Sequence, residues 1–351
     1  MMSSGWESWC VQMNEIRVIE AAGLGGRAAF LGFGPGNGLS GKERRRKFFS
    51  EFRSTHPAWD VLPKRGPCAL LAAMEGDKMV ARVMTGVDLE FVESTGQKQG
   101  YICLFEAENR QEAVGRLMDE VVRRQRQWGS ERVVGPISPN LVDFRSGVLV
   151  KGFDERPGVL SVHNPPWYDV LMTQCGFVKA QDFLAYRFQV ADGLPDQYEG
   201  AAAWARERTR IAVRNCDLGQ DERALLNVLN DCGEGMSLAE LRMGLGAIRP
   251  YYQKPFGFMA WKEGRPCGFL LALREGKAAH LRASQFFIAR PFRNGPTALL
   301  LMDALLKSAR KVGILTVEAS TILEENSASR AVMEGAGGTN HKIYRQYRLN
   351  L

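Results

Sequence analysis

Four side chains of this sequence stand out as candidates for the general base that takes up a proton during a reaction. His163 lies in a proline-rich stretch that also holds Asp143, and His280 directly precedes the predicted strand 281–289. Glu318 lies near the end of an otherwise apolar strand, where burial would raise the pKa of its carboxyl. Histidine and carboxylate side chains serve as general bases, so we expect a base among these four residues. An exposed strand end and an ordinary loop histidine are the alternative explanations of Glu318 and His163.

The composition and charge of the chain limit its function. The seven cysteines are scattered without a CxxC pair, and no histidines follow a metal-ligand spacing such as HxxxH. We therefore expect reduced thiols, no disulfide framework and no metal site. No apolar run reaches the roughly 18 residues of a membrane span, and residues 1–12 lack the features of a secretory signal, so we expect a cytoplasmic protein. The net charge of +7 fits an anionic ligand, a nucleic acid such as tRNA, or simply a basic surface.

The second half of the chain alternates strands and helices in a regular order. Ser237 followed by Glu240 forms a capping box at the start of a helix. Apolar residues at helical spacing predict a long helix, and the turn 262–266 predicts a hairpin. In order, we predict strand 208–215, helices 221–229 and 237–248, strands 256–261, 267–274 and 281–289, helix 296–312, strand 314–319, helix 326–334 and strand 342–349.

The first half repeats this order. We predict strand 16–19, a basic helix 42–52, a hairpin of strands 68–74 and 79–91, strand 101–105, helix 111–128, strand 132–134, helix 166–174 and strand 177–189. Segments 168–177 and 329–338 also resemble each other, and each leads to a Tyr-Arg pair. This repeat predicts an α/β (α+β) protein of two tandem domains, 1–195 and 196–351, divided in the Gly- and Pro-containing stretch 192–200.

One segment of the first half, 136–166, has no counterpart in the second. It carries five prolines, and its aromatic and apolar content argues against disorder. A connection of this length inside a compact domain is usually functional. We expect it to line a substrate pocket with residues in or next to it, namely Asp143, His163, Asn164, Trp167 and Tyr168.

The order of elements resembles the GNAT superfamily of acyltransferases, in which a strand, two helices, a three-strand meander and a long helix precede a strand, a helix and a last strand. Local motifs resemble a group of bacterial tandem-GNAT proteins regarded as N-acyltransferases. These motifs are FEAEN at 105–109, VGPISP at 134–139, LVKGFD at 149–154, NPPWY at 164–168 and LEEN at 323–326. The likeness covers most of the chain. It implies two tandem GNAT folds, each with a mixed, mostly antiparallel sheet flanked by helices.

The resemblance implies an acyl-CoA donor, usually acetyl-CoA, whose pyrophosphate lies on backbone N–H groups at the start of the long helix. In the second half Arg293, Asn294, Gly295 and Thr297 occupy this place, although Pro296 removes one donor. A plain polar turn is the alternative explanation of 293–295.

The corresponding stretch of the first half has Glu106, Glu108, Asn109 and Arg110 and no glycine. Its carboxylates would repel a pyrophosphate. We therefore expect only the second half to bind a phosphate-bearing donor, with the first half on the acceptor side.

The resemblance also implies catalytic roles. A backbone N–H at a bulge in strand 281–289 would polarise the acyl carbonyl, which makes Phe287 and Ile288 candidates. Tyr344 or Tyr347 would protonate the leaving group, and only one of them can face the cleft because they lie three positions apart on a strand. Ordinary packing within the sheet is the alternative explanation of each. Asn326 would lie beside the cofactor or act only as a helix cap.

Three functions fit these observations. The first is an acyl-CoA-dependent N-acyltransferase that acts on a small-molecule amine. The second uses an aminoacyl-tRNA as donor, which the basic run 42–47 and the net charge favour. The third is a GNAT pseudo-enzyme that binds a ligand without turnover. The short polar turn 274–280 replaces a longer hydrophobic insertion of the related group, which argues against a long-chain acyl donor or a membrane substrate. We expect no tightly bound cofactor and no DNA partner.

Overall fold

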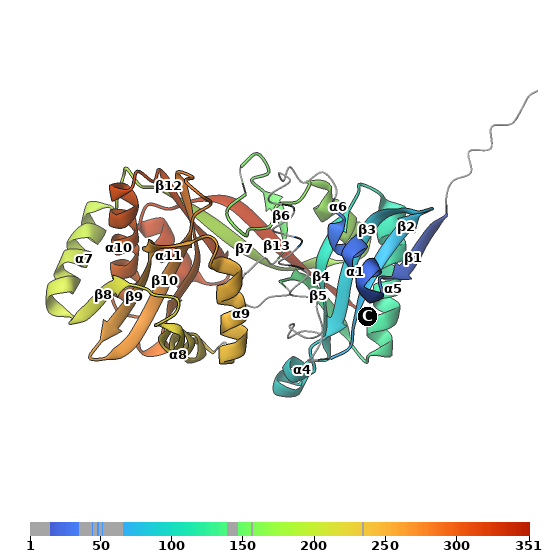
Figure 1. Ribbon diagram of the computed structural model, residues 1–351, viewed down its shortest axis with the longest axis horizontal. Coiled ribbons are helices and arrows are strands. Elements are labelled where there is room, and N and C mark those ends of the chain that lie inside the picture. The colour runs from blue at the N-terminus through green and yellow to red at the C-terminus, as the bar shows by residue number, and fades with distance from the viewer. Residues whose placement is uncertain are drawn as a thin grey trace, which may run out of the picture.

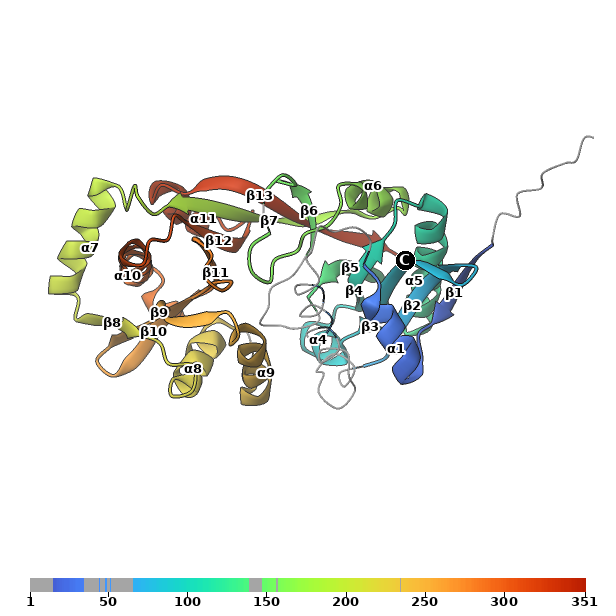
Figure 2. The same cartoon turned by 45° about the horizontal axis from the view of Figure 1, so that its top comes forward.

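The computed structural model describes residues 15–34, 44, 48, 51, 66–138, 147–155, 157–233 and 235–351. The molecule is elongated, with two lobes joined by two long strands (Figures 1 and 2). The predicted helix 42–52 lies outside the described residues except for Arg44, Phe48 and Glu51. No helix in the described part of the chain is both long enough and apolar enough to cross a membrane.

The first half of the chain forms the elements of the first lobe and one of the two connecting strands. They are β1 (Ile16–Glu20), α1 (Gly23–Gly32), β2 (Cys68–Glu75), β3 (Lys78–Val87), α4 (Leu89–Thr95), β4 (Gln99–Ala107), α5 (Gln111–Gln127), β5 (Arg132–Ile137), β6 (Val148–Lys151), α6 (Trp167–Gln174) and β7 (Val178–Gln189). Helices α5 and α6 pack on one face of the sheet around Leu117 and Met172. Helix α1 contributes Phe30 to a separate cluster with Met84 and Cys103.

The second half of the chain forms the elements of the second lobe and the other connecting strand. They are α7 (Asp196–Arg208), β8 (Ile211–Asn215), α8 (Glu222–Cys232), α9 (Leu238–Ile248), β9 (Tyr252–Lys262), β10 (Arg265–Leu273), β11 (His280–Ile288), the short 3-10 helix η1 (Arg290–Phe292), α10 (Thr297–Lys311), β12 (Thr316–Leu323), α11 (Ser327–Gly335) and β13 (Thr339–Asn350). Helices α7, α10 and α11 share one core, and α8 and α9 share another. The sheet therefore lies between two helical layers.

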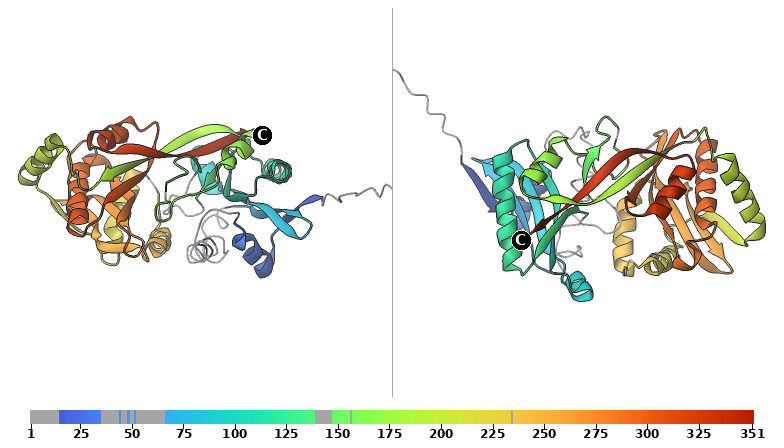
Figure 3. Two further views of the ribbon diagram at one scale, coloured as in Figure 1. Left: turned by 90° about the horizontal axis from the view of Figure 1, so that it is seen from above. Right: turned by 180° about the vertical axis from the view of Figure 1, so that it is seen from behind.

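The last strand of each half is exchanged with the other half. One continuous sheet has the order β1-β2-β3-β4-β5-β13-β7-β12-β11-β10-β9-β8, with β6 paired to β13. Strand β13 pairs with β5 of the first half, with Tyr347 opposite Gly135, and β7 pairs with β12 of the second half, with Phe188 opposite Val317. Figure 3 shows β7 and β13 side by side between the lobes.

The predicted order of elements is confirmed over the described residues, and so is the α/β fold class. Ser237 and Glu240 form the predicted capping box of α9. Four local predictions were wrong or incomplete, and one of them missed strand β6 inside the segment 136–166, where only a connection was expected. Residues 89–91 begin α4 and do not continue a strand, α1 was not predicted, and α7 begins at Asp196 inside the predicted linker. Helix α7 escaped prediction because it buries only two alanines, Ala202 and Ala205, which give a weak apolar pattern.

The strand exchange makes each half depend on the other. Fragments 1–195 and 196–351, produced separately, should each leave a sheet edge without its strand, and unpaired edges favour aggregation. Produced together, they should purify as a one-to-one complex whose far-ultraviolet circular dichroism matches that of the intact chain. Two fragments that are each soluble, folded and monomeric alone would contradict this prediction.

Candidate functional site

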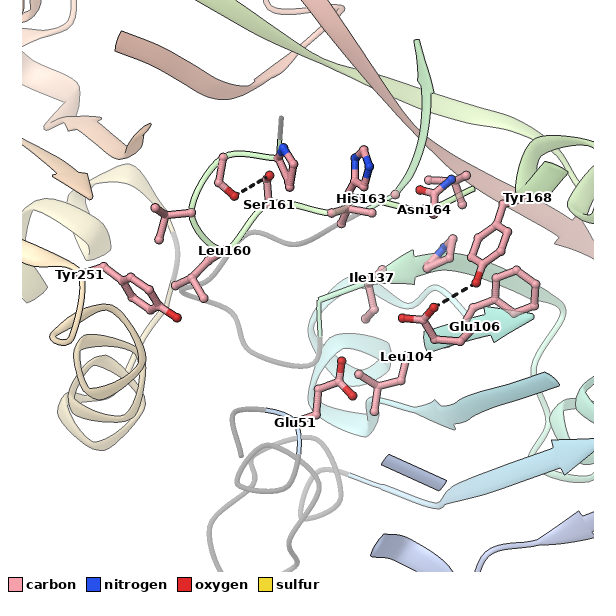
Figure 4. A pocket seen from close by; sticks show the side chains of 18 of the residues that line it. Glu51, Leu104, Glu106, Ile137, Leu160, Ser161, His163, Asn164, Tyr168 and Tyr251 are labelled. Atoms are coloured by element: carbon pink, nitrogen blue, oxygen red, sulfur yellow. Dashed lines mark hydrogen bonds between the residues drawn. The ribbon is translucent and has the colours of Figure 1, made fainter. Parts of the chain in front are cut away.

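A cavity of about 170 Å³ lies between the two lobes. Strand β4 contributes Leu104 and Glu106 to it, and the segment 157–164 forms the opposite wall. The second half of the chain contributes Tyr251 and Glu275. Figure 4 shows the carboxylates of Glu51 and Glu106 turned toward the middle of the cavity, across from Ser161 and His163. Both halves and the unmatched segment of the first half therefore build this space.

A bulge in β4 opens the cavity. The parallel pairing of β4 with β5 ends at Cys103 opposite Ile137. On the other side of β4 the register with β3 shifts between Cys103 and Glu106, and Leu104 has φ 53°. A left-handed backbone at leucine is strained and clusters at functional sites. The bulge turns β4 away from β5 and leaves room between the strands.

A buried ion pair holds the acidic side of the cavity in place. The Arg82 guanidinium is fully buried and donates to Glu51 Oε2 at 2.9 Å and to the Phe30 carbonyl at 2.9 Å. The same guanidinium lies 3.9 Å from Glu106 Oε1. Two carboxylates from distant segments thus share one cation that is closed to water.

The side chains of α6 close the far end of β4. The Ala107 N–H donates to the Tyr168 hydroxyl at 2.8 Å, and that hydroxyl donates to Glu106 Oε2 at 3.0 Å. The Trp167 indole donates to the Ala107 carbonyl at 3.2 Å. Burial, with the nearby Glu106 charge, raises the pKa of Tyr168 well above its ordinary value. Tyr168 is therefore a fixed donor to Glu106.

The segment opposite carries His163 and Asn164. The His163 Nδ1 is buried and has no hydrogen-bond partner among the described residues. Burial lowers the pKa of His163, and the charge of Lys342 lowers it further. Asn164 bonds both backbone groups of Leu149, accepting at 2.7 Å and donating at 3.2 Å, and so anchors the segment to β6.

One wall of the cavity lies directly against the second half of the chain. The Val159 carbonyl accepts from Arg282 at 2.8 Å. A side chain at Gly158 would meet Glu318 Oε1 at 2.9 Å and Arg282 Cδ at 3.1 Å. Arg282 and Glu318 are register partners, one position before the pairing of β11 with β12 ends at Ala283 opposite Ala319. The cavity and the point where β11 and β12 separate are thus adjacent.

The prediction of a raised pKa at Glu318 was wrong. Burial alone would raise that pKa, but a hydrogen bond with His341 and the charges of Lys342 and Arg282 outweigh burial and hold it well below its ordinary range. Lys342 Nζ lies 2.9 Å from Glu318 Oε2. Ser320 Oγ donates to Oε1 at 3.0 Å. Glu318 is a fixed anion here and a poor proton acceptor.

The structure brings only some of the predicted residues together. His163, Asn164 and Tyr168 line the cavity, whereas Trp167 lies beside it and Asp143 lies outside the described residues. His280 is exposed at the start of β11, where it bonds Thr316.

The two tyrosines proposed as acids lie in different packed clusters. Tyr344 is buried, and burial raises its pKa. Tyr347 donates to Asp169 at 2.5 Å, and burial together with this bond raises its pKa.

The residues predicted to bind the donor lie around the start of α10. Arg293, Asn294 and Gly295 are exposed, and Thr297 is the buried first residue of the helix, with no partner for its hydroxyl among the described residues. Asn326 caps α11 by accepting from the Ser329 N–H at 3.0 Å.

The expected position of the bulge in β11 was wrong. It lies at Ser284, where the register against β10 shifts between Ala283 and Gln285, whereas Phe287 and Ile288 keep regular pairing with Phe269 and Gly268. The space between β11, β12 and helices α10 and α11 is nearly filled by apolar side chains. A cavity of only about 20 Å³ remains there.

Sequence reasoning missed the acidic side of the cavity. Glu106 was considered only as a group that repels phosphate, and Glu51 and Arg82 were not considered. One signal was present, because Arg82 interrupts an apolar strand and a buried charge needs a partner.

Comparison with known proteins supports the architecture. No family model matches the chain. Protein YghO of Escherichia coli (strain K12) is 24% identical over 313 residues, covering 78% of this chain and 80% of that protein. Bacterial ceramide synthase of Caulobacter vibrioides (strain NA1000 / CB15N) is 22% identical over 324 residues, covering 79% and 82%. A solved tandem GNAT protein from the clavulanic acid biosynthesis pathway superposes with a TM-score of 0.61 at 12% identity, covering 96% of this chain and 98% of that chain.

The chain therefore has the tandem GNAT fold, as its sequence resemblance predicted. At these identities the similarity to solved structures establishes the fold alone.

Removing the cation behind the two carboxylates should destabilise the protein. Removing one partner of a buried ion pair costs about 3–5 kcal/mol. Arg82→Met should therefore lower the free energy of unfolding by about this amount. Urea denaturation would measure the loss. As a matched control, Lys98→Met removes an exposed pair with Glu131 and should change much less. Equal effects of the two substitutions would contradict the assigned role of Arg82.

The lowered pKa of His163 predicts a pH dependence of stability. Below the unfolded-state value of about 6.5, the unfolded chain binds a proton that the folded protein resists, so the unfolding free energy should rise with pH up to that value and then level. His163→Asn should flatten this rise. Urea midpoints between pH 5 and pH 8 test the effect, and an unchanged slope in the variant would refute it.

Proposed function

We propose that this chain is an N-acyltransferase that moves an acyl group from an acyl-CoA thioester to the amine of a small molecule. The observation that carries the proposal is the cavity between the lobes of a tandem GNAT fold, with one wall against the point where β11 and β12 separate. Separating strands leave backbone N–H and C=O groups without ladder partners, which a ligand can use. An acyl group at that point and an amine in the cavity would be neighbours.

The two long helices differ in what they offer an anionic donor. The first turn of α10 has no acidic residue, and its first N–H with a backbone acceptor is that of Leu300. Within the described part of the chain no backbone acceptor meets the N–H groups that precede it in the helix, so they can meet phosphate oxygens at the positive end of the helix. Helix α5 carries Glu112 in its first turn and Glu108 just before it. This contrast supports a donor site at Arg293, Asn294, Gly295 and Thr297.

The chemical step needs a base for the amine. Of the candidate bases in the described part of the chain, His163 alone lines the cavity, and its lowered pKa keeps the ring neutral near pH 7. In the proposed step the acceptor first loses its ammonium proton to water; the neutral amine nitrogen then attacks the thioester carbonyl and gives a second proton to His163. The C–N bond forms, the C–S bond breaks, and the thiolate leaves and takes up a proton.

An aminoacyl-tRNA donor is the second candidate. The net charge of +7 favours it, because contacts with a nucleic-acid backbone rely on excess Lys and Arg. Pro296 at the N-cap of α10 also favours it, since it leaves one backbone donor fewer for a pyrophosphate.

Acetyl-CoA should raise the melting temperature of the purified protein, because a ligand that binds only the folded state stabilises it as its concentration passes Kd. Arg293→Ala should reduce the shift. Lys277→Ala, which removes an exposed charge in the turn between β10 and β11, should not.

Bulk tRNA at low and high salt provides the second arm of this experiment. If tRNA raises the melting temperature in a salt-sensitive way and acetyl-CoA does not, the donor is an aminoacyl-tRNA and not an acyl-CoA thioester. A shift with acetyl-CoA but no amide product with any amine would mean binding without turnover, and it would refute the enzyme assignment.

A further inference from the structure

We propose that the cavity between the lobes binds a compact primary amine in its ammonium form and that Glu106 recognises the ammonium group. This inference rests on the proposed function, since it names the class of acceptor. It concerns binding, however, and binding can be measured without any acyl donor.

The charges around the cavity favour a cation. Three carboxylates line it, those of Glu51, Glu106 and Glu275. Among the described lining residues there is no lysine or arginine, and His163 has a lowered pKa. Arg82 lies behind the first two carboxylates and is paired with Glu51 at 2.9 Å. A carboxylate or phosphate in this cavity would meet like charges, whereas an ammonium group would meet opposite ones.

Glu106 is the carboxylate whose position is best fixed. Its Oε2 accepts from the Tyr168 hydroxyl at 3.0 Å, and that hydroxyl is itself oriented by the Ala107 N–H. Its Oε1 lies 3.9 Å from Arg82. A carboxylate held in this way loses little freedom when it accepts from an ammonium group, and such charge-assisted hydrogen bonds are strong. A neutral analogue of the same shape would leave that interaction unmade.

The size of the cavity limits the enclosed part of the ligand. An engineered cavity of about 150 Å³ holds one benzene molecule, so 170 Å³ encloses a group of about six to eight non-hydrogen atoms. The nucleotide part of coenzyme A is far larger, so the cavity is an acceptor site and not a donor site. Leu104, Ile137, Leu160 and Val162 line it as well, which suits a hydrocarbon body behind the amine.

Three probes of one size test the inference. Benzylamine, benzyl alcohol and benzoate carry a cationic, a neutral and an anionic group on the same ring. Calorimetric titration of the full-length protein without acyl donor should show binding of benzylamine, about tenfold weaker binding of the alcohol and none of benzoate. Equal or tighter binding of the alcohol or benzoate would overturn the inference, and so would no binding of any probe.

Two variants place the site. Glu106→Gln should weaken the binding of benzylamine about tenfold and leave the binding of benzyl alcohol unchanged. Glu108→Gln is the matched control, since Glu108 pairs with Lys78 outside the cavity. Leu160→Trp should fill the cavity and abolish binding. Melting curves establish that each variant is folded, and normal benzylamine binding to folded Glu106→Gln and Leu160→Trp proteins would refute the site.

Failure of this inference differs from failure of the proposed function. Selective benzylamine binding without amide formation from any acyl donor would uphold the cation site and refute acyl transfer. Amide formation with an unchanged KM for the amine in Glu106→Gln would uphold acyl transfer and refute recognition by Glu106.

Discussion

Strands β7 and β13 pair antiparallel over nearly their whole lengths, from Thr339 opposite Arg187 to Arg348 opposite Val178. Each also pairs with a strand of the other half, β13 with β5 and β7 with β12. The backbone hydrogen bonds at the centre of the sheet are therefore complete only when both halves are folded. This edge-to-edge connection also brings segment 157–164 of the first half against β11 and β12, so the cavity depends on the exchange.

The buried charges tie the register of the exchanged strands to the rest of the molecule. Glu318 on β12 meets Lys342 and His341 from β13, and Arg282 from β11 lies on its other side. A buried carboxylate is costly unless it is paired. The pairing of β13 with β7 is irregular between Asn340 and Lys342, which lets both His341 and Lys342 reach Glu318, and another register would separate these charges. The network thus favours one pairing, and through Arg282 and the Val159 carbonyl it also positions the cavity wall.

Sequence reasoning succeeded where a pattern is local. The capping box of Ser237 and the amphipathic face of α10 lie within single elements, and both were predicted correctly. The strand exchange was not predictable, since β13 satisfies the same apolar pattern beside either half. The predicted rise in the pKa of Glu318 was wrong for a related reason, because one of its partners, Lys342, lies on the exchanged strand. Part of the unmatched segment, 157–164, does line the cavity, whereas Glu51 and Arg82 meet only through the fold.

The two halves share one structural feature, a parallel strand pair that ends beside a bulge, but they differ in the charges around it. The bulges lie at Leu104 in β4 and at Ser284 in β11. The opening in the first half is hollow and acidic, and Tyr168 and Trp167 occupy both backbone groups of Ala107 at its end. The space beside the bulge of the second half is apolar and nearly filled, and helix α10 of that half begins without carboxylates. An anion is repelled from the first and tolerated at the second, and an ammonium group has the reverse preference. Under the proposed function, the two copies of the fold divide the substrates of one reaction, because neither opening has to bind both a cation and an anion.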